Sequence, residues 1–123
     1  MNEQILVIDD SHTITKSLEI ILTKWKFKVL CAYNGKSGVE FVKKFKPDVI
    51  FLDIDMPDMN GFDTLIEIKK LMNEEYSSTV IMLSGHNSTN DVIQAMKNGA
   101  NDYIVKPFDE QLLSQKLKKY LLF

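Results

Sequence analysis

Five short runs of apolar residues constrain the fold of this chain more than any other feature of its sequence. They cover residues 5–8, 29–32, 49–52, 80–83 and 103–105. Runs of this length that are rich in β-branched residues and lack polar alternation are typical of strands buried on both faces, as in a parallel sheet. The sequence therefore predicts five buried strands.

Segments with helical periodicity separate and follow these runs. Apolar side chains recur at three- and four-residue spacings over residues 14–25, 39–45, 65–72 and 113–120. Residues 88–91 have the composition of a helix start, and Gly99 that of a helix stop. A strand–helix alternation repeated five times predicts an α/β fold with a five-stranded parallel sheet and helices on both faces. An α+β fold with one antiparallel edge strand remains the alternative.

Length and composition predict one domain and exclude several classes of function. A chain of 123 residues without repeats or a linker is expected to form a single domain over residues 1–123. All 15 basic residues are lysine and the net charge is −2, so direct binding to nucleic acid is not expected.

The same features predict a location. No apolar run approaches the roughly 20 residues of a membrane span, and residues 1–4 carry no basic signal region, so we expect a cytoplasmic protein without membrane contact. The single cysteine, Cys31, fits a reducing compartment and is expected to be buried and inert.

Polar residues with chemical capacity follow four of the five predicted strands. Asp9 and Asp10 come after the first, Asp53 after the third, Ser84 after the fourth and Lys106 after the fifth. Ligands of open parallel sheets bind beyond the carboxyl ends of the strands, so these side chains are expected to converge. Three carboxylates favour a hard divalent cation, with Mg²⁺ the best fit, and a lysine beside it favours phosphoryl transfer to an aspartate.

Each of these residues also has a simpler structural interpretation. Asp9 and Asp10 can cap a helix, and Asp53 can belong to a turn, since Pro57 and Gly61 follow closely. Such interpretations fail together, because independent turns would not all supply the parts of one site.

The sequence resembles the receiver domains of bacterial two-component response regulators over its whole length. The motifs that carry the resemblance are, in order, Asp9-Asp10, Asp53 with Met56-Pro57 and Gly61, Ser84-Gly85, Tyr103, and Lys106-Pro107-Phe108. The resemblance implies a doubly wound five-stranded parallel sheet of the (βα)5 flavodoxin-like class, with a strand order of 2-1-3-4-5.

The resemblance also implies a role for each site residue. Asp53 is implied to be the phosphoacceptor, and Asp10, Asp53 and the backbone carbonyl of Asp55 to be ligands of Mg²⁺, for which Mn²⁺ can substitute. Asp9 is implied to reach the ion through water.

Four further residues receive roles from the same resemblance. Lys106 is implied to pair with the phosphoryl oxygens, and its peptide bond to Pro107 to be cis. Ser84 is implied to donate a hydrogen bond to a phosphoryl oxygen, and Tyr103 to swing inward when Ser84 moves.

Three positions depart from the family pattern. Asn60 stands where the family often has aspartate, and no cost to function is expected because the residue lies in a turn. Asp55 and His86 each lie two residues beyond a site residue on neighbouring loops. We predict that they pair and lengthen the lifetime of the phosphoryl group, the alternative being that both are solvated and irrelevant.

The predicted function is a phosphorylation-activated switch that catalyses its own phosphorylation and slow dephosphorylation and is not a turnover enzyme. The partners that this implies are a histidine kinase or histidine phosphotransfer protein as donor and an output protein or a further effector domain as target. A monomer is expected, with a phosphorylation-linked dimer left open. The alternatives are a small phosphohydrolase of the haloacid dehalogenase type, suggested by Asp53-x-Asp55, and a degenerate receiver that binds partners without phosphorylation.

Overall fold

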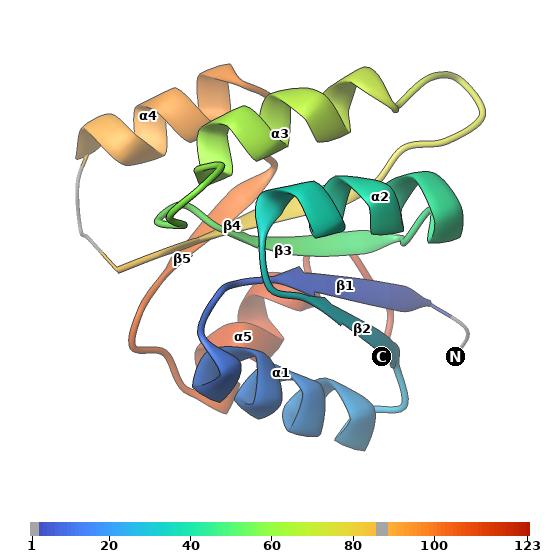
Figure 1. Cartoon of the computed structure of the whole chain (residues 1–123). Helices are drawn as coiled ribbons and strands as arrows, with labels where there is room; N and C mark the ends of the chain where they lie inside the picture. Colours follow the sequence, from blue (N-terminus) through green and yellow to red (C-terminus); the bar gives the residue numbers. More distant parts are fainter. Residues whose placement is uncertain (1–2, 86–88) are drawn as a thin grey trace.

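The computed structural model describes residues 3–85 and 89–123, and these form one sheet flanked by helices on both faces (Figure 1). The elements alternate along the chain as β1 (Gln4–Ile8), α1 (His12–Lys24), β2 (Lys28–Ala32), α2 (Gly35–Phe45), β3 (Val49–Asp53), α3 (Gly61–Lys70), β4 (Thr79–Ser84), α4 (Thr89–Lys97), β5 (Asp102–Val105) and α5 (Glu110–Leu117).

The sheet has the order β2-β1-β3-β4-β5, and every neighbouring pair of its strands is parallel. The predicted fold class and strand order are therefore confirmed, and the alternative with an antiparallel edge strand is wrong. The strand order reverses direction between β1 and β3, which is the place where open sheets of this kind bind ligands.

Two apolar layers hold the helices on the sheet. Alternate strand residues such as Leu6 and Ile50 pack against α2, α3 and α4, while their neighbours such as Val7 and Phe51 pack against α1 and α5. Figure 1 shows the same division, with α1 and α5 on one face of the sheet and the other helices on the opposite face. Because both faces are covered, the central strands are apolar throughout, as the sequence predicted.

Side chains at the helix ends determine where the helices begin and end. Ser11, Asn34, Asn60 and Asp109 are the N-caps of α1, α2, α3 and α5, and each accepts a hydrogen bond from a backbone N–H in the first turn. Gly99, with a φ of 98°, lies just past the end of α4, as predicted. The predicted start of α4 includes Ser88, which lies outside the described residues.

The edge strands are less buried than the sequence predicted. Cys31 lies in β2, whose residues are mostly half-buried because this strand has a neighbour on one side. Burial still raises the pKa of the Cys31 thiol, with a further contribution from Glu19. The expectation that Cys31 is buried was therefore wrong, because the cysteine lies in an edge strand and is half-buried.

The last helix is shorter than its apolar periodicity indicated. It ends at Leu117, and Tyr120 lies beyond it. The backbone oxygen of Asn101 and Asp102 Oδ2 both lie 3.1 Å from the Tyr120 hydroxyl and share its single proton, so polar contacts hold this residue at the start of β5. None of the helices formed by residues 3–85 and 89–123 combines the length and apolarity needed to cross a bilayer.

Candidate functional site

The predicted site residues gather at the carboxyl edge of the sheet. Asp9 follows β1, Asp53 ends β3, and Ser84 ends β4, with Asp53 paired in register to Leu83 and Ser84 to Val105. Lys106 follows β5 directly, and its backbone N–H donates to the Ser84 carbonyl oxygen at 2.6 Å. The parallel register therefore places residues from four separate strands beside one another, as the sequence predicted.

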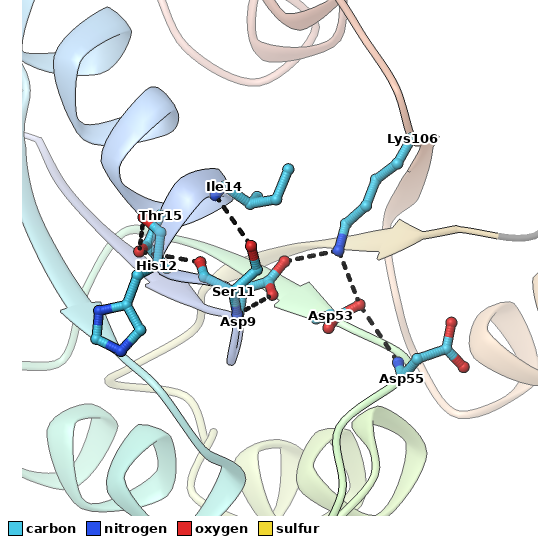
Figure 2. Close-up of polar contacts among 8 residues, drawn as sticks. All are labelled: Asp9, Ser11, His12, Ile14, Thr15, Asp53, Asp55 and Lys106. Carbon is cyan, nitrogen blue, oxygen red and sulfur yellow. Dashed lines mark hydrogen bonds and ion pairs between the residues drawn. The ribbon is translucent and has the colours of Figure 1, made fainter.

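Lys106 links two buried carboxylates. Its Nζ lies 2.7 Å from Asp9 Oδ2 and 3.2 Å from Asp53 Oδ1 (Figure 2). The side chains of Asp9 and Asp53 are 0% and 3% exposed, and that of Lys106 is 19% exposed. The sequence did not predict the ion pair between Lys106 and Asp9, because it assigned Lys106 to the phosphoryl oxygens. The one signal for this pair was that both residues follow strands of the same parallel sheet.

The start of α1 holds Asp9 in place. The Ser11 backbone N–H donates to Asp9 Oδ1 at 2.9 Å, and Ser11 Oγ accepts from the Ile14 N–H at 3.3 Å. Ser11 is therefore the N-cap of α1, and the simpler interpretation of Asp9 and Asp10 as capping residues is wrong. The side chain of Asp10, which caps no helix, is exposed at the edge of the site.

The buried charges shift the proton affinity of the site. Burial and the neighbouring charge of Asp9 raise the pKa of Asp53 to about 7, although Lys106 opposes this. Burial lowers the pKa of Lys106, but its hydrogen bond to Asp9 and the charges of both aspartates outweigh burial and raise that pKa above the usual value. The lysine is therefore a permanent cation, whereas the charge on Asp53 is costly without a further positive partner.

The carboxylates offer a ligand set for such a partner. One oxygen each from Asp9, Asp10 and Asp53 lies within 4.8 Å of the others. The set contains oxygen atoms alone and combines two buried groups with one exposed group, so water can complete a coordination sphere. Donors of this kind fit Mg²⁺, which prefers oxygen ligands and retains several waters.

The loop between β3 and α3 returns to the backbone of Asp53. The Asp55 N–H donates to Asp53 Oδ1 at 3.3 Å, and the Gly61 N–H donates to the Ile54 carbonyl oxygen at 2.8 Å. A Cβ at Gly61 would lie 2.6 Å from Ile54 Cα and would also overlap the Asp53 carbonyl oxygen. Glycine is therefore required here because two backbone segments touch. Asn60, which precedes it, is the α3 N-cap, in agreement with its expected place in the turn.

Asp55 is exposed, and its side chain turns away from the Asp53 carboxylate (Figure 2). Its Oδ2 would lie 3.9 Å from a Cβ added at Gly85, the residue after β4. His86 lies outside the described residues, so its pairing with Asp55 stays a prediction.

Three further predicted features and one exposed histidine also have clear positions. Ser84 is fully buried at the end of β4, and the Lys106–Pro107 peptide bond is cis. Tyr103 lies in β5, half-buried against the layer formed by α2, α3 and α4. His12 is exposed and stacks on Tyr33 with ring centroids 4.2 Å apart.

Comparisons with known proteins agree with this arrangement. A family model described as the response regulator receiver domain matches residues 5–118. Chemotaxis protein CheY of Thermotoga maritima is 38% identical over 120 residues, which make up 97% of this chain and 98% of that protein.

Two solved structures illustrate the likeness in three dimensions. Chemotaxis protein CheY4 of Vibrio cholerae matches with a TM-score of 0.91 at 26% identity, over 98% of this chain and 100% of that one. A structure of the CheX–CheY–BeF3–Mg²⁺ complex from Borrelia burgdorferi matches with a TM-score of 0.89 at 29% identity, over 98% of this chain and 90% of that one.

Proposed function

Because the chain belongs to the response regulator receiver domain family, it is a phosphorylation-dependent signalling switch rather than a turnover enzyme, and we propose that Asp53 is its phosphoacceptor. The observation that carries this proposal is the bridge at the carboxyl edge of the sheet. There a buried Asp53 shares the ammonium of Lys106 with a second buried carboxylate, Asp9. This arrangement combines a nucleophile with a fixed cation.

In the proposed reaction, a carboxylate oxygen of Asp53 attacks the phosphorus of a phosphohistidine on the donor protein. The phosphorus–nitrogen bond breaks, its electron pair stays on the leaving imidazole nitrogen, which takes a proton from water, and an aspartyl phosphate forms. Lys106 Nζ, which lies 3.2 Å from Asp53 Oδ1, stabilises the negative charge of the incoming phosphoryl oxygens. Slow attack by water on the same phosphorus returns the protein to its resting state.

We propose a divalent cation beside Asp53. Asp10, Asp53 and the backbone carbonyl of Asp55 would hold Mg²⁺, with Asp9 reaching it through water, and Mn²⁺ would substitute. When bound, the ion supplies positive charge to the phosphoryl oxygens. The close approach of the three carboxylates supports this assignment, since without a cation they repel one another.

The signal is proposed to leave the site through Ser84 and Tyr103. Ser84 would move to donate a hydrogen bond to the phosphoryl group, and Tyr103 would turn inward, changing the surface formed by α4, β5 and α5. The bond from the Lys106 N–H to the Ser84 carbonyl oxygen supports this path, because it joins the ends of β4 and β5 beside Asp53. The change is a shift between two populated states.

The proposed phosphodonor is a histidine kinase or a histidine phosphotransfer protein in the cytoplasm, and the proposed target is an output protein or a further effector domain. A monomer is expected, with dimerisation linked to phosphorylation as the alternative. The Borrelia CheY was solved together with CheX, which illustrates partner binding by a relative.

Labelling by acetyl phosphate in the presence of Mg²⁺ tests the proposal. Intact-mass spectrometry should show about one phosphoryl group per chain, sensitive to hydroxylamine, and Asp53→Ala should remove it. Asp58→Ala is the matched control, because this exposed aspartate lies on the loop that follows Asp53 and should leave labelling unchanged. Persistent label on Asp53→Ala would overturn the assignment, and steady turnover of a phosphate ester would favour the phosphohydrolase instead.

A further inference from the structure

One carboxylate at the start of β5 collects hydrogen-bond donors from both β5 and the C-terminal segment. Asp102 is 8% exposed, and its Oδ1 accepts from Lys116 Nζ at 2.7 Å and from the Tyr103 N–H at 2.8 Å. Its Oδ2 accepts from the Tyr120 hydroxyl at 3.1 Å and lies 3.5 Å from Lys119 Nζ. Burial raises the pKa of Asp102, but these donors outweigh burial and lower the pKa, so the carboxylate is charged at neutral pH.

The same lysine also contacts the ring of Tyr103. Lys116 Nζ lies 4.8 Å from the centroid of that ring, within the range of a cation–π interaction. Asp102 and Tyr103 are successive strand residues, so their side chains leave β5 on opposite faces of the sheet. Because β5 is an edge strand, Lys116 can reach both groups from α5.

We propose that Lys116 is a positioning residue for the switch, which holds the Tyr103 ring in its resting orientation through an ammonium anchored by Asp102. This role rests on the proposed function, in which Tyr103 turns inward on phosphorylation. Before any phosphoryl group is bound, Lys116 would therefore set the equilibrium between the two orientations of the Tyr103 ring.

The anchor makes the contact specific to one ring orientation. Side-chain rotamers of tyrosine differ by about 120° at χ1, so a change of rotamer carries the ring away from its present place. The ammonium cannot follow the ring without leaving Asp102, to which it is bound at 2.7 Å with its side chain 19% exposed. Rotation of Tyr103 therefore breaks the cation–π contact, and removal of the lysine charge should favour the rotated state.

Two lysines on the same carboxylate provide a matched pair of variants. Lys116→Met keeps the aliphatic stem and removes the charge that lies over the ring. Lys119→Met makes the same change of charge at the lysine on the other oxygen, Oδ2, and Lys116→Arg restores a cation that stacks on aromatic rings.

The readout is the NMR signal of the Tyr103 ring in protein with ¹³C-labelled tyrosine, assigned among the four tyrosines by Tyr103→Phe. Beryllofluoride with Mg²⁺ serves as the phosphoryl mimic. In Lys116→Met without the mimic, the signal should move toward its position in the loaded parent, and beryllofluoride should bind about two- to fivefold more tightly, as a contact of this strength predicts. Lys119→Met and Lys116→Arg should both resemble the parent.

The outcomes separate this inference from the proposed function. A ring signal that moves on loading of the parent but is the same in Lys116→Met and Lys119→Met would overturn the role of Lys116 and leave the proposed function intact. A parent ring that does not respond to beryllofluoride, despite saturable binding at Asp53, would overturn the switch itself and this role with it.

Discussion

Replacement of Asp53 by asparagine is expected to stabilise the fold in the absence of divalent cations, although it removes the proposed phosphoacceptor. The ionised Asp53 side chain is 3% exposed and lies beside a second buried carboxylate, Asp9, with one ammonium between them. An uncharged amide of the same shape removes this repulsion and the cost of burying the charge.

The pKa of Asp53 sets the size of the effect. A carboxyl with a pKa of 3.8 in the unfolded chain and about 7 in the folded protein makes its ionised form unfavourable by at most about 4 kcal/mol. Asparagine makes weaker hydrogen bonds to Lys106 and to the Asp55 N–H, which costs about 1 kcal/mol each. The expected gain is therefore about 2 kcal/mol, or roughly 8 °C in Tm for a chain of this size.

Urea denaturation in EDTA at several pH values measures this gain. A carboxyl whose pKa is raised on folding binds its proton more tightly in the folded state, so the parent loses stability as the pH rises from about 4 to about 7. The difference between Asp53→Asn and the parent should therefore be largest near pH 8 and shrink toward pH 4. Saturating Mg²⁺ should also reduce it, because the ion stabilises the folded parent.

Asp102→Asn is the matched control with the opposite sign. The pKa of Asp102 is lowered on folding, so its charge adds stability above pH 3.8 that is lost as the pH falls below this value. The control should therefore be less stable than the parent at pH 8. An Asp53→Asn protein that is no more stable than the parent at pH 8 in EDTA would refute the electrostatic reasoning.

Three further predictions concern the site. Asp10→Ala should weaken Mg²⁺ binding at least tenfold in titrations followed by NMR shifts, because its exposed carboxylate is a proposed direct ligand; unchanged binding would move the ion elsewhere. Lys106→Ala should accept phosphate from acetyl phosphate more slowly and, once phosphorylated, fail to show the Tyr103 ring shift; a normal shift would contradict its role in the switch. Asp55→Ala and His86→Ala should each shorten the phosphoryl lifetime severalfold in autodephosphorylation assays. If the two residues pair, the double variant should lose its phosphoryl group no faster than the single variants. Single variants that decay no faster than the parent would refute the role of the pair.

Much of the fold could be predicted from the chain because its local signals agree. Five apolar runs separated by helical periodicity define the alternation of strands and helices, and parallel pairing follows from that alternation. Burial at the edges could not be predicted, since the strand that contains Cys31 has the same apolar pattern as the central strands. Whether a strand lies at the edge or in the centre of a sheet depends on its neighbours, and the composition of the strand alone does not reveal it.

The site residues could also be predicted, because residues that follow parallel strands meet at one edge. Asp9, Asp53, Ser84 and Lys106 were predicted in this way and lie where expected. Their contacts could not be predicted. Lys106 bridges two aspartates that are 97 and 53 residues away in the chain, and the direction of its long side chain depends on which carboxylates are buried beside it.

The sequence by itself determined which chemical groups this protein brings to the carboxyl edge of its sheet, because periodicity and strand ends are local properties of a chain. The tertiary structure alone decided which charged groups contact one another. It placed the Lys106 ammonium between Asp9 and Asp53 at that edge, and the Lys116 ammonium between Asp102 at the start of β5 and the ring of Tyr103. Distances of a few ångströms govern electrostatic energies, and such distances between residues far apart in the chain exist only once the sheet and its helices have packed.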